Sequence, residues 1–248
     1  MEALSPTDHP YEHTTIGSHE DLQAATLDDV IGFFQTWYVP NNATLVVVGD
    51  VSHDEVRRLA KKSFGWIPRC PEPPRVTITE PAQTEKRSAT FTPKNGPVPI
   101  AILAFQAVPQ GHPDSLPLEM LMNILGGGES SRLYLDVVRR KEVATMAMAM
   151  SGGFEQAGFA AAVGVSMPFG DTDAILDALW EQVELIKAEG VTEEEMEKVR
   201  HQVAREEVTG ALTVASKASI LGSAAVTLGD AQLANTRAAQ MDTITAKD

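Results

Sequence analysis

The 248-residue sequence contains a single cysteine, Cys70, so no disulfide can form within the chain and its redox compartment is left open. It has no run of about 18 apolar residues and no basic segment that leads into an apolar stretch. We therefore expect a soluble protein with neither a membrane span nor a signal peptide.

Positive charge is also scarce. Lys and Arg number 20 against 34 Asp and Glu, which gives a net charge of −14. Because nucleic acids and anionic membrane surfaces attract proteins through Lys and Arg, we expect neither as a partner. The composition, 43% hydrophobic and 22% charged, is that of a globular protein with one large domain or two smaller ones.

The first part of the chain has the pattern of a helix, a strand and a second helix. Thr26 and Asp29 are spaced as a capping box, and the apolar residues that follow recur with helical spacing. Residues 43–48 form a valine-rich apolar run, which is typical of a buried strand. Ser52 and Glu55 form a second capping pattern and predict another helix. We expect this part to expose a strand edge and to exchange its amide hydrogens faster than the rest.

Residues 66–84 contain five prolines, too many for a packed helix or strand, so we interpret them as a semi-rigid linker. The expected domains are then residues 1–65 and 85–248. The second domain is expected to be α+β, because strand patterns come first and helix patterns later. The expected strands span residues 86–92, 98–106, 144–150 and 158–165, and the expected helices span 113–125, about 131–138 and most of the chain from residue 171.

A run of three glycines, Gly126, Gly127 and Gly128, follows the first of these helices. A phosphate-binding loop would need a Lys-Ser or Lys-Thr pair next to the glycines, and that pair is absent. We therefore interpret the run as a helix stop.

Residues His9, Glu12 and His13 spell H-x-x-E-H, the inverted zincin motif. Two such histidines bind one zinc ion only when a helix places them on the same face. The proline after the first histidine and the β-branched residues after the second disfavour that helix, and no apolar stripe accompanies it. We therefore interpret the motif as a polar loop that binds no metal. The alternative, a genuine site, would need Glu20 or Asp21 as a third ligand.

Longer strings of the sequence resemble the M16 zinc metallopeptidases, the pitrilysin and insulinase family. The strings are HPYEHTTIG at residues 9–17, EDL at 20–22, WYVPNNATLVVVGDV at 37–51, FGWIP at 64–68, GHPD at 111–114 and LGGGESSRLY at 125–134. The resemblance spans nearly the whole chain and identifies it with the end of the first repeat and most of the second, inactive C-terminal repeat. It implies LuxS/metallohydrolase-like repeats, in which helices flank an antiparallel sheet, with the first repeat incomplete.

The resemblance implies that zinc and the catalytic H-x-x-E-H helix lie on an upstream segment or a partner chain, so no cofactor is expected in this chain. In the second repeat, Glu119, Met122 and Asn123 fall near the positions of the metal-binding helix, and Met and Asn are poor zinc ligands. The family's substrate-binding Arg corresponds to Arg139, although Met146 stands where the family has a Tyr. An Arg at a helix end also caps carbonyl groups, which is the structural alternative for Arg139.

Two functions follow from the resemblance. The first is the non-catalytic part of an M16-like zinc peptidase, which helps to enclose a peptide or unfolded polypeptide opposite a catalytic half or partner subunit; a dimer is one expected arrangement. The second is a stand-alone structural or binding subunit of a peptidase-derived complex. Whether the protein is an enzyme stays open, since the chain lacks the catalytic helix and is expected to be inactive alone. A bacterial cytoplasm or periplasm is the expected location.

Overall fold

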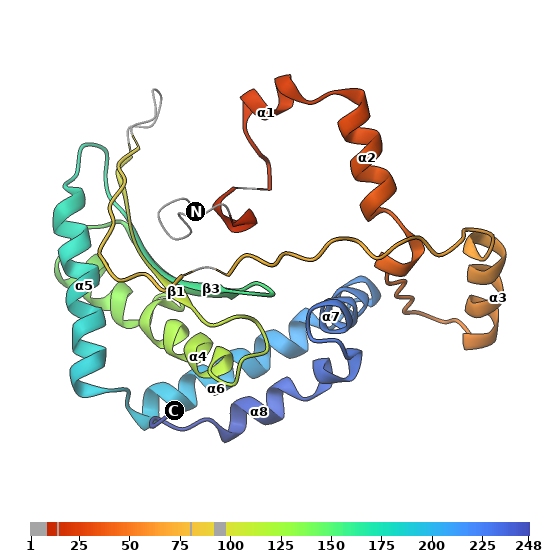
Figure 1. Ribbon diagram of the computed structural model, residues 1–248. Coiled ribbons are helices and arrows are strands. Elements are labelled where there is room, and N and C mark those ends of the chain that lie inside the picture. The colour runs from red at the N-terminus through yellow and green to blue at the C-terminus, as the bar shows by residue number, and fades with distance from the viewer. Residues whose placement is uncertain (1–8, 14, 80, 92–97) are drawn as a thin grey trace. The chain divides into compact units, whose positions relative to one another are not determined.

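The computed structural model describes residues 9–13, 15–79, 81–91 and 98–248 (Figure 1). The chain divides into two compact units. The first consists of Met1–Glu80 and Gly210–Ala234, and the second of Pro81–Thr209 and Asn235–Asp248. In the described parts of the chain, no helix is long and apolar enough to cross a membrane.

The first unit is built from helices and extended segments. Its elements are η1 (Pro10–Glu12), α1 (His19–Ala24), α2 (Leu27–Trp37), η2 (Pro40–Asn42), α3 (His53–Phe64), α7 (Val214–Thr227) and the short turn η4 (Ala231–Asn235), whose last residue belongs to the second unit. The capping box that predicts α2 is confirmed: the Thr26 amide donates to Asp29 Oδ2 (2.9 Å), and the Asp29 amide donates to Thr26 Oγ1 (3.3 Å). The cap of α3 is confirmed as well, because the Glu55 amide donates to Ser52 Oγ.

The predicted strand at residues 43–48 is wrong. This segment forms no ladder with any strand that the structure describes, although its composition suits a sheet. The Val46 side chain instead lies against α7, where a Cβ on Gly222 would be 3.4 Å from Val46 Cγ2. Leu45 and Val47 remain 60% and 45% exposed. Valine-rich composition favours a strand only where a neighbouring strand offers hydrogen bonds, and no described segment offers them here.

We expect the amides of residues 44–48 to exchange without protection in hydrogen-exchange mass spectrometry. None of them donates a backbone hydrogen bond within the described structure. By contrast, the central strand of the second unit is paired on both sides, and its amides should exchange at least about a thousandfold more slowly, through global opening. Equal protection of the two segments would show that residues 43–48 pair with another strand in solution.

The second unit contains a three-stranded antiparallel sheet with the order β1-β3-β2. The strands are β1 (Ile100–Ala107), β2 (Met146–Gly153) and β3 (Gly158–Val165), so three of the four predicted strands are confirmed within a few residues. The fourth is wrong over residues 86–91, which form no strand; its last residue, 92, lies outside the described residues. This segment begins with Lys86 and Arg87, and it pairs with neither edge of the sheet.

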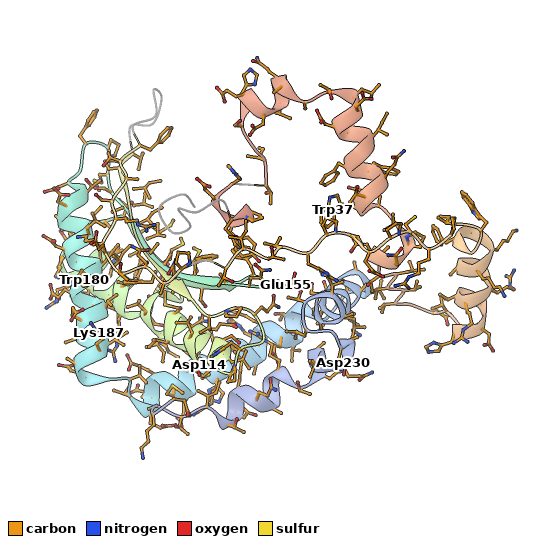
Figure 2. The ribbon with its side chains drawn as sticks, in the orientation of Figure 1. Trp37, Asp114, Glu155, Trp180, Lys187 and Asp230 are labelled. Atoms are coloured by element: carbon orange, nitrogen blue, oxygen red, sulfur yellow. The ribbon has the colours of Figure 1, made fainter. Side chains whose placement is uncertain are left out.

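Helices cover one face of this sheet (Figure 1). The helix α4 (Ser115–Gly126) packs on β2, and α5 (Thr172–Glu189) packs on β1 and β3. Small residues on the covered face permit this close approach, since Ala101, Gly164 and Ala147 lie side by side in the register. The main core includes Leu133, Val137, Ile175 and Leu179, all fully buried. Trp180 of α5, labelled in Figure 2, stacks on Phe105 at the margin of this core.

The other face of the sheet is apolar and largely open. Ile100, Ile102, Met146 and Met150 are between 42% and 59% exposed. The register places them on the same side of the sheet as Val163, which lies between Ile102 and Met148. Met146, Met148 and Met150 therefore line one edge of this face, as alternation along the strand requires.

A second core joins α4 to two later helices, α6 (Glu193–Gly210) and α8 (Arg237–Thr243). Its buried members are Met120, Ile124, Met196, Val199, Val203, Met241 and Ile244. A capping box begins α6: the Thr192 amide donates to Glu195 Oε2 (2.8 Å), and the Glu195 amide donates to Thr192 Oγ1 (3.2 Å). Helices around a small antiparallel sheet confirm the predicted α+β class.

Candidate functional site

The H-x-x-E-H residues do not share a helix face. The 3-10 turn η1 ends at Glu12, and His13 has extended backbone angles (φ −89°, ψ 145°). His9 is buried, its Nδ1 accepts a hydrogen bond from the Tyr11 amide (3.1 Å), and its ring lies 4.3 Å from the Tyr11 ring, whereas His13 is exposed. Within the described residues, no group of three or more His, Cys, Asp or Glu side chains is placed to hold a metal ion. The two histidines therefore lack the shared helix face that the zinc motif requires. That the motif binds no metal remains a prediction.

The basic residues at the end of the π-helical segment η3 (Tyr134–Arg140) differ in their pairing. Arg140 and Lys141 both form ion pairs with the buried Asp136 and with Glu181 of α5. Burial alone would lower the pKa of Lys141, but its hydrogen bonds to Glu181 and Asp136 raise it. Arg139 is exposed, and its side chain makes no hydrogen bond or ion pair with any residue that the structure describes. Of the three neighbouring cations, Arg139 alone has no ion-pair partner among the residues that the structure describes.

Met146, which stands where the resemblance expects a Tyr, is the first residue of β2 and is 49% exposed. A thioether cannot donate the hydrogen bond that a phenol would. The second half of the expected substrate-binding pair is therefore apolar, on the open face of the sheet.

The three positions that correspond to the metal-binding helix do not fit zinc. Met122 is buried in the core that faces the sheet. The Asn123 side-chain amide donates to the Glu119 carbonyl (3.0 Å), so it is engaged by its own helix. The Glu119 carboxylate forms an ion pair with Arg237, which also lies 3.1 Å from Glu207 Oε1 through its Nε. The guanidinium of Arg237 thus already pairs with the Glu119 carboxylate that a metal ion would need as a ligand.

Arg132 forms the best-defined ion pair of the unit. Its Nε and Nη2 donate to the two carboxylate oxygens of Glu195 (2.6 and 2.8 Å), and Nη2 also donates to the Gly190 carbonyl (2.9 Å). The hydrogen bond from Arg132 and the bonds from Thr192 lower the pKa of Glu195 to about 2, and Glu195 in turn raises the pKa of Arg132. This two-pronged geometry fastens the residues just before η3 to the start of α6, so the Arg of the S-S-R-L-Y string has a structural contact.

Glu207, Arg237 and Glu181 were not predicted from the sequence. Arg237 lies 118 residues from its partner Glu119, so no local pattern indicates the pair. The pairing of Asp136 with Arg140 has the i, i+4 spacing of a helical ion pair and was open to prediction.

The comparisons with known proteins agree on one family. The family model described as the Peptidase M16 inactive domain matches residues 24–203. The zinc protease PqqE of Helicobacter pylori is 28% identical over 194 residues, covering 77% of this chain and 44% of that protein. The uncharacterized zinc protease YmxG of Bacillus subtilis is 22% identical over 195 residues, covering 79% and 46%. The chain thus spans about half the length of these relatives.

Solved structures show the same fold. The crystal structure of a protease from Helicobacter pylori superposes with a TM-score of 0.90 at 25% identity, covering 96% of this chain and 58% of that one. A peptidase M16 inactive domain from Pseudomonas fluorescens superposes with a TM-score of 0.83 at 17% identity, covering 99% and 57%. The family model matches most of the chain, and the relatives and folds agree with it, so the chain belongs to the M16 peptidase family, as a member of its inactive-domain group.

Proposed function

We propose that this chain is the non-catalytic portion of an M16 zinc metallopeptidase and helps to enclose a peptide or unfolded polypeptide opposite a catalytic half. The zinc ion and the H-x-x-E-H helix would belong to that half. The observation that carries the proposal is the guanidinium of Arg139, which has no partner among the described residues, in a repeat where Met122 and Asn123 stand at two of the three metal-helix positions.

The structural alternative for Arg139, capping the end of η3, is not needed. Among the described residues, the Arg139 side chain donates to no carbonyl group, and two carbonyl groups near the end of η3 are bonded by backbone amides: Lys141 donates to the Asp136 carbonyl (2.8 Å), and Val143 donates to the Val137 carbonyl (3.2 Å). Keeping a long charged side chain beside two paired cations stabilises nothing in the described fold. Such a side chain suits a ligand, and a peptide carbonyl or carboxylate accepts the charge-assisted hydrogen bond that Arg offers.

The open apolar face of the sheet is consistent with a polypeptide ligand. Methionine side chains adapt to different partners because they are unbranched and polarizable. Met146 and Met150 present such side chains on the edge strand β2, which contacts η3.

We expect Arg139→Gln to lower kcat/KM for an unfolded peptide by about 10- to 100-fold, the value of one charge-assisted hydrogen bond. The assay combines the chain with an M16 half that carries the H-x-x-E-H helix, either separate or in the same polypeptide. The matched control is Arg205→Gln, because Arg205 is also exposed and its side chain has no partner among the described residues. The control should leave kcat/KM unchanged.

Three results would contradict the proposal. Hydrolysis by the chain alone with zinc would place the chemistry in this repeat. An equal effect of the two substitutions would remove Arg139 from substrate binding. A complex with the catalytic half that hydrolyses no peptide, while the chain still assembles stably, would favour the stand-alone structural subunit.

A further inference from the structure

Three helices of the second unit meet at one arginine. Arg237 is the first residue of α8, and its guanidinium contacts carboxylates from α4 and α6, those of Glu119 and Glu207. The side chains are 40%, 33% and 29% exposed, so the group is partly withdrawn from water. One guanidinium therefore forms ion pairs with two carboxylates.

The two carboxylates depend on this cation. Glu207 Oε1 is buried and makes no hydrogen bond of good geometry with the residues that the structure describes, so the Arg237 Nε at 3.1 Å is its charge compensation. Without Arg237, two like charges would remain next to the core formed by Met120, Val203 and Met241. A carboxylate withdrawn from water without a partner is costly.

The position of this cluster is also where zinc does not fit. Glu119 and Asn123 lie four residues apart on α4, near the positions that the family resemblance assigns to metal-binding histidines. A zinc ion there would have to displace Arg237 from Glu119 and would find an amide in place of a second imidazole.

We infer that Arg237 takes the place of a metal ion in this repeat: it is a built-in cation that neutralises Glu119 and Glu207, fastens α8 to α4 and α6, and keeps the position closed to zinc. The inference does not depend on the role proposed for Arg139. The cluster then links three helices through one cation, as a structural metal ion does where it couples binding to folding.

The inference is tested by thermal unfolding of the full chain. Arg237→Met should lower Tm by on the order of 5 °C, since a change of about 1 kcal/mol moves Tm by about 2–4 °C in a chain of this size. The triple variant Glu119→Gln, Glu207→Gln, Arg237→Met should regain most of that loss, because no like charges remain. Arg205→Met, on the exposed surface of α6, is the control and should leave Tm unchanged.

Zinc chloride provides the second measurement. Tm of the unaltered chain should not respond to equimolar Zn²⁺, whereas Asn123→His with Arg237→Met frees two carboxylates and adds an imidazole, so its Tm should rise with Zn²⁺. The further change Glu207→Gln should abolish that rise. Arg237→Lys keeps the charge and provides a folded variant of intermediate Tm if Arg237→Met does not fold.

Two outcomes would overturn the inference. A triple variant as unstable as Arg237→Met would show that charge neutralisation is not what Arg237 supplies. Stoichiometric zinc bound by the unaltered chain and lost on Glu119→Gln would show that the position is a metal site after all.

Discussion

Replacing Gly126 with alanine is expected to destabilise the chain by about 3 kcal/mol, the upper range for overpacking a core. A Cβ at this position would lie 1.9 Å from the Ala149 backbone nitrogen and 2.5 Å from the Met148 carbonyl carbon. No rotamer change relieves this overlap, because the atoms in the way belong to the backbone of β2. The helix α4 would have to move off the sheet and expose part of the core that contains Leu125.

Urea unfolding followed by circular dichroism measures this effect. Gly32→Ala is the control, because Gly32 lies in the exposed middle of α2 with nothing within 4 Å of its Cβ position. That change should stabilise its helix by about 0.5–1 kcal/mol, since alanine favours a helix over glycine. If Gly126→Ala unfolded at the same urea concentration as the unaltered chain, the close packing of α4 on β2 would be incorrect.

The glycine run shows how far a local pattern reaches. The sequence predicts a helix stop at Gly126 to Gly128, and α4 does end at Gly126, with Gly128 in the left-handed region (φ +87°). The contact that requires the first glycine involves Ala149, which lies far along the chain. The local sequence indicates where the helix ends. The reason why Gly126 can carry no Cβ becomes clear only from the packing of α4 on β2 in the folded protein.

The same distinction separates the confirmed elements from the wrong ones. Capping boxes are complete within four residues, so Thr26 with Asp29 and Thr192 with Glu195 were predictable. A strand is defined by its neighbour, so the composition of residues 43–48 was not sufficient.

The candidate site was predictable in part. Arg139 was identified by its place just after a string that resembles the family, but only the structure shows that Arg140 and Lys141 are paired and that Arg139 has no partner among the described residues. Glu207 and Arg237 escaped prediction because charged residues are common on helix surfaces and their pairing depends on how α6 and α8 pack.

Replacing Arg132 with methionine is expected to destabilise the chain by about 2–3 kcal/mol at neutral pH, which is typical of losing hydrogen bonds to a charged group that is mostly buried. The side chains of Arg132 and Glu195 are 17% and 21% exposed, and methionine removes both hydrogen bonds to the carboxylate and the one to the Gly190 carbonyl. Lys187→Met is the control, because its ion pair with Glu184 is 64% and 46% exposed and should be worth less than about 1 kcal/mol.

Acid unfolding separates the charge of Glu195 from its packing. The folded pKa of about 2 lies below the ordinary value of 4.5, so the folded state binds the proton less readily than the unfolded state. The stabilisation is therefore fully present above about pH 4.5 and is lost as the pH falls through about 2. Glu195→Gln cannot titrate, so its free energy of unfolding should decrease less between pH 5 and pH 2 than that of the unaltered chain. Parallel acid curves for the two proteins would mean that the Arg132 pair does not depress this pKa, and the link between the residues before η3 and the start of α6 would then not depend on the charge of Glu195.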